Sequence, residues 1–476
     1  MDAVAAGAPT KLVEGDEPMF KALDLDMGDI HIIDHIVEQM EEELGTDREA
    51  ALADMRYSYI EDLCAQCVVK HQETREQLRS EKIDQVLTSK YFGIPVFLLI
   101  MLVIFWLTFS VIGAPLQDLL GAWIDQFTAW LSVTLTGLQV TPWLVSLIID
   151  GVCAGVGSVL SFLPIIVLLF FFLSLLEDSG YMARVAFVMD KLLRKIGLSG
   201  RSFVPMLIGF GCSVPAIMAT RTLSSDRDRK MTIVLTPFMS CSAKLPIYGM
   251  ITAAFFPDHA ALVMVSLYVL GIMVAILSGL LLKKTIFQGN SVPFVMELPA
   301  YRLPDAKSVL LHMWEKAKDF LHKAFTIIFI ASIVIWFLKS FDWRLNMVAD
   351  SADSILASIG SVIAPVFSPL GFNDWRASTA LITGFTAKES VVSTLTILTG
   401  STTDAQLSAA LAQIFTPLSA FSFLAFTILY MPCVAAFAAS RRELGSMKEA
   451  ILTAAYQTLA AYIVGTIIFQ VGSLIF

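Results

Sequence analysis

Three of the six cysteines lie in apolar stretches beside residues that interrupt helices. Cys212 follows Gly211, Cys433 follows Pro432, and Cys241 lies in the run Pro-Phe-Met-Ser-Cys-Ser-Ala-Lys. Thiolates bind soft and borderline metals such as ferrous iron, copper and zinc in preference to magnesium or calcium. The paired C-x-x-C spacing of a closed zinc site is missing from these stretches. The pattern therefore favours weak, open coordination of a metal cation, although a lone buried cysteine also packs as a small apolar residue.

An adjacent base and acid, Lys388 and Glu389, interrupt another apolar stretch. An ionised side chain deep in a bilayer is costly unless it faces a partner or water, so its presence points to a function. The alternative is a shallow hairpin whose charges reach the membrane surface. We expect Glu389 to supply a hard oxygen ligand and Lys388 to be its counter-ion when no cation is bound. The predicted metal ligands are Cys212, Cys241, Cys433, Glu389, Ser213 and Ser390.

The amino-acid composition indicates which kinds of segment hold these residues in place. The 476 residues are 56% hydrophobic and 16% charged, with a mean hydropathy of +0.72 and a net charge of −9. Residues 1–90 hold 21 acidic and 9 basic side chains and read as an acidic, cytoplasmic helical segment. The net negative charge of this segment is unsuited to binding the negatively charged backbone of a nucleic acid. No G-x-x-x-x-G-K-[ST] loop and no assembled nucleophile and base are present, so we predict no enzymatic activity.

The rest of the chain is typical of a membrane protein, because apolar runs of about 20 residues are long enough to cross a bilayer. We predict seven spans, at 92–113, 151–176, 231–256, 259–282, 323–338, 417–440 and 450–476. Basic residues are concentrated in alternate loops, which places the N-terminus in the cytoplasm. Residues 115–150 and 345–373 are apolar but interrupted, and we expect them to form interfacial or partial helices outside the membrane.

Two further apolar stretches are expected to enter the membrane and return. Basic residues lie on both sides of 202–220, whereas 377–398 precedes a loop, 399–416, without any basic residue. The two stretches should therefore enter from opposite faces. Opposed broken hairpins in corresponding halves mark the substrate site of inverted-repeat transporters. The predicted fold is an all-α polytopic membrane protein with about seven transmembrane helices, two opposed broken or re-entrant hairpins in inverted repeats, and a small N-terminal cytoplasmic helical segment.

Five motifs in order resemble the membrane part of the ferrous iron transport protein B (FeoB) family. They are Glu-Asp-Ser-Gly-Tyr-Met-Ala-Arg at 177–184, Gly-Phe-Gly-Cys-Ser-Val-Pro-Ala-Ile-Met-Ala-Thr-Arg at 209–221, Pro-Phe-Met-Ser-Cys-Ser-Ala-Lys-Leu-Pro-Ile-Tyr at 237–248, Gly-Phe-Thr-Ala-Lys-Glu-Ser-Val-Val at 384–392 and Pro432-Cys433. The likeness covers roughly residues 55–476. It implies import of Fe²⁺ across the bacterial cell inner membrane through two gate regions, with Fe²⁺ as the transported substrate and no permanently bound cofactor.

The resemblance also implies a division of the chain. We expect a spacer remainder at 1–90, the first transmembrane helix with outer interfacial helices at 91–164, gate regions at 165–260 and 325–440, a central connecting region at 261–324, and a C-terminal transmembrane helix at 441–476. On the motif positions, the family's gate cysteines fall on Cys212, Cys241 and Cys433 and its acidic gate position on Glu389. Ser213 stands where that family often has Asn.

Members of that family usually begin with a GTP-binding domain, which this sequence lacks. The resemblance therefore implies either a separate G protein that supplies the switch or a version that works without one. A small accessory protein, a homo-oligomer and membrane lipid are the other partners that we expect. Two other functions remain open from the residues alone. One is a secondary transporter of an organic solute such as a nucleoside, which would use Glu389 and Lys388 for a coupling ion. The other is a membrane receptor whose acidic segment binds a partner.

Overall fold

A computed structural model describes residues 11–15, 17–23, 25–44, 48–67, 75–89, 92–288, 301–348, 351–401 and 403–475. The chain forms two compact units, Met1–Arg79 and Ser80–Phe476. The regular elements of the described residues are all helices, and these residues also contain one isolated antiparallel backbone bridge between Phe341 and Met347. The predicted all-α fold is therefore confirmed.

The first unit contains three short helices, α2 (Glu17–Ala22), α3 (Met27–Leu44) and α4 (Arg48–Cys67). Its buried core is small and includes Val37, Ala51 and Leu52. The acidic segment is thus helical, as predicted. The next helix, α5 (Arg75–Leu87), leads into the second unit.

The second unit, Ser80–Phe476, is here called the membrane unit. Its first half runs to residue 288. It contains α6 (Gly93–Trp106), α7 (Gly113–Gly137), α8 (Pro142–Ser146), α9 (Ala154–Asp178), α10 (Tyr181–Ile196), α11 (Phe203–Gly209), α12 (Ser213–Ala219), α13 (Asp226–Leu235), α14 (Leu245–Phe255) and α15 (Ala260–Thr285). The second half contains α16 (Ala306–Ser340), α17 (Ile355–Ile363), α18 (Trp375–Thr386), α19 (Ser390–Leu398), α20 (Asp404–Ile414), α21 (Pro417–Leu429), α22 (Val434–Leu444) and α23 (Met447–Ile475).

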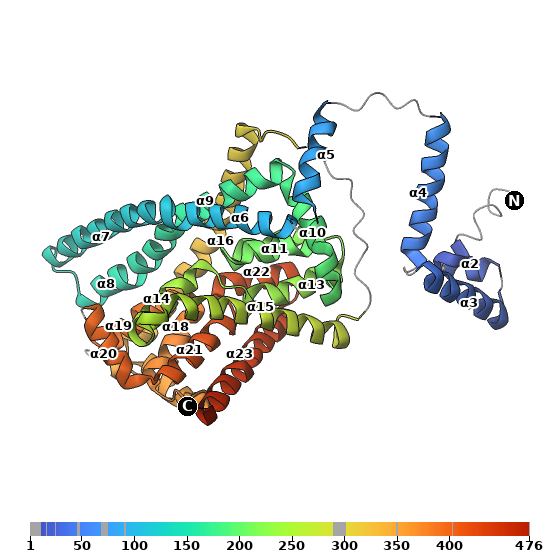
Figure 1. The fold of residues 1–476 in the computed structure, drawn as a ribbon. Helices are drawn as coiled ribbons and strands as arrows, with labels where there is room; N and C mark the ends of the chain where they lie inside the picture. The colour runs from blue at the N-terminus through green and yellow to red at the C-terminus, as the bar shows by residue number, and fades with distance from the viewer. Residues whose placement is uncertain are drawn as a thin grey trace. The chain divides into compact units, whose positions relative to one another are not determined.

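The order of elements in the first half recurs in the second. In each half a long helix (α9 or α16) is followed by a broken hairpin (α11 and α12, or α18 and α19), a broken span (α13 and α14, or α21 and α22) and a final long helix (α15 or α23). The second half also contains α20 between its hairpin and its broken span. The contacts also exchange halves, because α12 packs on α22 while α19 packs on α14. In Figure 1 the green helices of the first half accordingly lie among the orange and red helices of the second. This exchange is what a two-fold relation between two repeats produces.

The predicted number of about seven spans stays a prediction. Four helical segments in the described part are long and apolar enough to cross a membrane, namely Gly93–Gly137, Pro257–Thr285, Pro417–Leu444 and Met447–Ile475. Two bent pairs raise the number to six, with bends of 83° between α9 and α10 and of 102° before α18. The predicted continuous span at 231–256 is wrong, because the helix is interrupted between Leu235 and Leu245. The interfacial placement of 115–150 stays a prediction.

An ion pair joins three segments of the membrane unit at the start of α10. The Arg184 guanidinium is 1% exposed and donates from Nε and Nη2 to the two carboxylate oxygens of Asp84 in α5, each at 3.0 Å. The Tyr301 hydroxyl donates to Asp84 Oδ1 at 2.9 Å, and its ring lies 4.1 Å from the guanidinium carbon. Burial, together with this hydrogen bond, raises the pKa of Tyr301. The cluster anchors α5 to the membrane unit.

Replacing Arg184 with Met should destabilise the membrane unit strongly, because it leaves the Asp84 carboxylate without its bidentate partner. We expect a loss of about 3 kcal/mol, as for other broken buried ion pairs, measured as a lower thermal unfolding midpoint in detergent. The control is Arg194→Gln, which removes an ion pair whose arginine is 43% exposed and should cost less than about 0.5 kcal/mol. Equal shifts for both variants would contradict the anchoring role.

Candidate ion path at four helix breaks

Four helices of the membrane unit are interrupted, and the interruptions are here named breaks 1 to 4. Break 1 (210–212) lies between α11 and α12, break 2 (239–241) between α13 and α14, break 3 (387–389) between α18 and α19, and break 4 (430–433) between α21 and α22. Breaks 1 and 3 lie in the two predicted hairpins, whose interruption is confirmed; the entry of these hairpins from opposite faces of the membrane stays a prediction. Breaks 2 and 4 fall inside segments predicted as unbroken spans.

Prolines explain the two unexpected breaks. Pro237 lies just before break 2, and Pro432 lies within break 4. Proline has no N–H to donate and clashes with the carbonyl of the residue four positions earlier. For Pro432 that residue is Ile428, so its carbonyl needs a partner from elsewhere. Backbone groups freed at membrane depth must be buried in protein or face a wet cavity.

Hydrogen bonds connect the four breaks in series. The Ser242 amide and hydroxyl both donate to the Gly211 carbonyl, at 3.1 and 3.0 Å, which joins breaks 1 and 2. The Lys244 ammonium donates to the Ile428 carbonyl at 2.6 Å, which joins breaks 2 and 4. The Lys388 ammonium donates to the Met431 carbonyl at 2.8 Å, which joins breaks 3 and 4. The breaks of both halves therefore form one polar centre inside the apolar unit.

The predicted ligands share one position relative to the helices. Cys212, Cys241, Glu389 and Cys433 each occupy the N-cap of the helical turn that follows their break. None of the four makes a side-chain capping hydrogen bond. Ser, Thr, Asp and Asn are the residues that cap helices well. Helix formation therefore does not account for three cysteines and a glutamate at these positions.

The predicted ligands and the two lysines differ in how far they are buried. Cys212, Cys241, Cys433, Glu389 and Ser390 are half-buried, whereas Ser213 is 5% exposed and both Lys244 and Lys388 are 2% exposed. Cys212 lies within electrostatic range of Cys241, Cys433 and Glu389. The structure thus brings ligands from both halves into one region. Among the described residues, however, no three His, Cys, Asp or Glu side chains form a group that could hold a metal ion.

The predicted pairing of Lys388 with Glu389 is wrong. The Lys388 ammonium instead lies 3.1 Å from the centre of the Tyr430 ring and binds the Met431 carbonyl. The two residues occupy successive positions in the turn before α19. Sequence reasoning also missed the role of Lys244. No local pattern signals it, because the Ile428 carbonyl that Lys244 binds lies 184 positions further along the chain.

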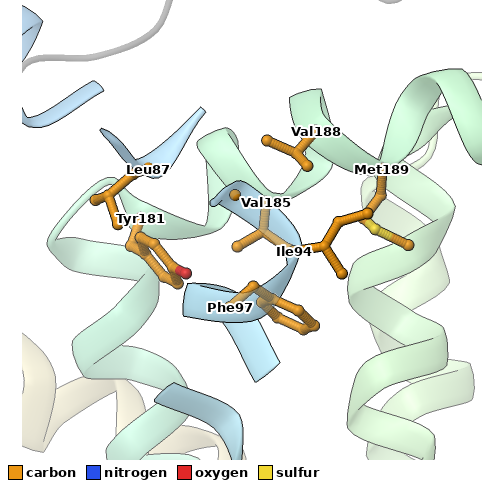
Figure 2. A pocket seen from close by; sticks show the side chains of 8 residues that line it. Leu87, Ile94, Phe97, Tyr181, Val185, Val188 and Met189 are labelled. Atoms are coloured by element: carbon orange, nitrogen blue, oxygen red, sulfur yellow. The ribbon is translucent and has the colours of Figure 1, made fainter. Parts of the chain in front are cut away.

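A pocket elsewhere in the membrane unit is lined almost entirely by apolar side chains. It lies where the end of α5 and the start of α6 meet α10 (Figure 2), and it is lined by Leu87, Gly93, Ile94, Phe97, Tyr181, Val185, Val188 and Met189. Its only side-chain polar group is the Tyr181 hydroxyl. We therefore place the candidate site at the breaks and not in this pocket.

Comparison with known families identifies relatives of most of the chain. A family model described as "Gate: Nucleoside recognition" matches residues 159–255 and 321–447, which include all four breaks. A model described as "Ferrous iron transport protein B C terminus" matches residues 264–316, and one described as "FeoB cytosolic helical domain" matches residues 9–69.

Individual relatives agree with these models. A protein of Staphylococcus aureus (strain COL) named Fe(2+) transporter FeoB is 47% identical over 88% of this chain and 63% of its own length. One of the same name from Methanocaldococcus jannaschii is 37% identical over 94% of this chain and 66% of its own length. A Porphyromonas gingivalis protein, named as a fusion of Fe(2+) transport protein A with FeoB, is 38% identical and matches 98% of this chain and 60% of its own length. The chain thus spans less than two thirds of these relatives. No solved structure matches it.

Tight packing around break 3 predicts a selective effect of adding one methyl group. A Cβ on Gly384 would lie 2.5 Å from Val391 Cγ2 and 2.6 Å from the Tyr430 hydroxyl, whereas a Cβ on Gly249 would meet nothing within 4 Å. Gly384→Ala should therefore destabilise the unit by about 1–3 kcal/mol through overpacking. Gly249→Ala, also in a helix, should leave the thermal midpoint unchanged or raise it slightly. A midpoint for Gly384→Ala at or above the wild-type value would contradict the packing described at break 3.

Proposed function

Because the chain belongs to the ferrous iron transport protein B family, we propose that it carries Fe²⁺ across the bacterial inner membrane, from periplasm to cytoplasm, along a path at the four breaks. The observation that carries this proposal is the common N-cap position of Cys212, Cys241, Cys433 and Glu389 at breaks that are hydrogen-bonded in series. Soft thiolates and a carboxylate suit a borderline cation such as Fe²⁺. Ser213 and Ser390 would add neutral oxygen ligands.

The absence of a closed ligand group in the described residues fits passage better than storage. A conducted ion must bind well enough to enter and weakly enough to leave, so several weak sites serve better than one tight site. Cu²⁺ and Zn²⁺ bind more tightly than Fe²⁺ to nearly any such ligand set. Selectivity for iron would therefore come from geometry and from which metal is free on the periplasmic side.

The proposed function also suggests a role for each of the other parts of the chain. Regions 165–260 and 325–440 would be the two gates, 261–324 would connect them, and residues 1–90 would stay in the cytoplasm. Membrane lipid would surround the unit. A G protein, a homo-oligomeric arrangement and a small accessory protein are proposed partners; the fused Porphyromonas relative supports the last of these.

The nucleoside alternative is not favoured. The word nucleoside occurs in the description of the gate model, but the relatives that cover most of the chain are named Fe(2+) transporters. A nucleoside transporter would also leave three cysteines at N-cap positions unexplained. An organic-solute path predicts that Cys→Ser changes at the breaks leave transport intact.

Uptake of radiolabelled Fe²⁺ into proteoliposomes under reducing conditions tests the proposed path. Cys212→Ser and Cys433→Ser should each lower the initial rate about tenfold, a size typical of weakened metal sites, because a hydroxyl replaces a soft ligand. The matched control is Cys153→Ser, since Cys153 is half-buried but lies outside the breaks. Rates equal to wild type in both break variants would remove the thiols from the mechanism.

A further inference from the structure

Lys244 carries a positive charge into the polar centre of the membrane unit. Its side chain is 2% exposed. Its ammonium donates to the Pro237 carbonyl at 3.2 Å, the Met239 carbonyl at 3.3 Å and the Ile428 carbonyl at 2.6 Å. An ammonium has three donors, so these three bonds satisfy it completely. Carbonyl oxygens arranged in this way are also the ligands that replace water around an ion inside a channel.

The bond to Ile428 joins the two halves of the unit. Pro432 deprives the Ile428 carbonyl of its ordinary helical donor, and Lys244 of the other half supplies a charged replacement. A charge-assisted hydrogen bond of this kind is about twice as strong as a neutral one. While it is made, break 2 is held against break 4.

The same ammonium lies beside the proposed ligands of the transported ion. Cys241 and Cys433 are within electrostatic range of Lys244, and so is the second buried ammonium, that of Lys388. The Lys244 and Lys388 side chains lie near enough to repel each other when both are protonated, because repulsion is weakly screened where the dielectric constant is low. A divalent cation arriving between Cys241 and Cys433 would therefore meet a resident positive charge.

We propose that Lys244 is a resident cation of the ion path, which holds breaks 2 and 4 together when the path is empty and is displaced by the arriving metal. This inference rests on the proposed function and deepens it. Displacement lowers the affinity of the path for the metal and frees the two halves to move apart. Lys244 is thus a positioning residue: it lowers the affinity of the path for the metal and thereby raises the rate of transport.

The test is the concentration dependence of Fe²⁺ uptake by Lys244→Met and Lys244→Arg proteoliposomes. Removing the charge should lower the half-saturating Fe²⁺ concentration by about tenfold, because a repulsive partner is lost, and should lower the maximal rate because the metal leaves slowly. Lys244→Arg keeps the charge and should stay within about twofold of the wild-type half-saturating concentration. Equilibrium binding of radiolabelled Fe²⁺ to the detergent-solubilised chain should tighten in Lys244→Met in the same proportion.

A purely structural brace gives a different pattern. It predicts a lower thermal midpoint and a lower maximal rate for Lys244→Met, with half-saturation and equilibrium binding unchanged, and that result overturns the proposal. If Lys244→Met does not fold, Lys244→Gln is the second variant, because its amide still donates to the surrounding carbonyls without the positive charge and should also tighten binding; unchanged binding there equally overturns the proposal. Absence of Fe²⁺ uptake by the wild-type chain would instead overturn the proposed function itself.

Discussion

Every backbone N–H and C=O group at membrane depth must have a hydrogen-bond partner, and the rest of the structure depends on this constraint. Four broken helices expose such groups in one apolar unit, and the cost of leaving them unpaired is several kcal/mol each. The chain meets this need with its own polar groups: Ser242 on the Gly211 carbonyl, Lys244 on Ile428 and Lys388 on Met431. Because each bond crosses from one break to another, satisfying the backbone also assembles the breaks into a single centre.

The chemistry of the path follows from this assembly. An N-cap residue stands where the chain enters a helix, so its side chain lies at the break itself. Cys212, Cys241, Cys433 and Glu389 at these positions bring the four proposed ligands to the polar centre without a rigid coordination shell. These four residues are half-buried, whereas the two lysines, which bind carbonyls, are almost inaccessible.

The sequence was informative where the physical signal is local. Breaks 1 and 3 lie in the two stretches, 202–220 and 377–398, that were predicted to enter the membrane and return because of the basic residues around the first and the loop without basic residues after the second. Breaks 2 and 4 were missed because 417–440 is free of charge and 231–256 carries only Lys244, so hydropathy describes both as spans. A proline such as Pro237 or Pro432 fits either a kink or a full interruption of a helix. The partners of Lys244 and Lys388 depend on contacts between residues far apart in the chain, which periodicity does not encode.

The central claim is that thiols of both halves line the route of the metal, and thiol protection tests it directly. The reduced, solubilised chain is treated briefly with a maleimide with and without Fe²⁺, and the labelling of each cysteine is read by mass spectrometry. The account predicts that Fe²⁺ slows labelling of Cys212, Cys241 and Cys433 together and leaves Cys153 unaffected. Equal labelling of all four cysteines with and without Fe²⁺ would contradict it.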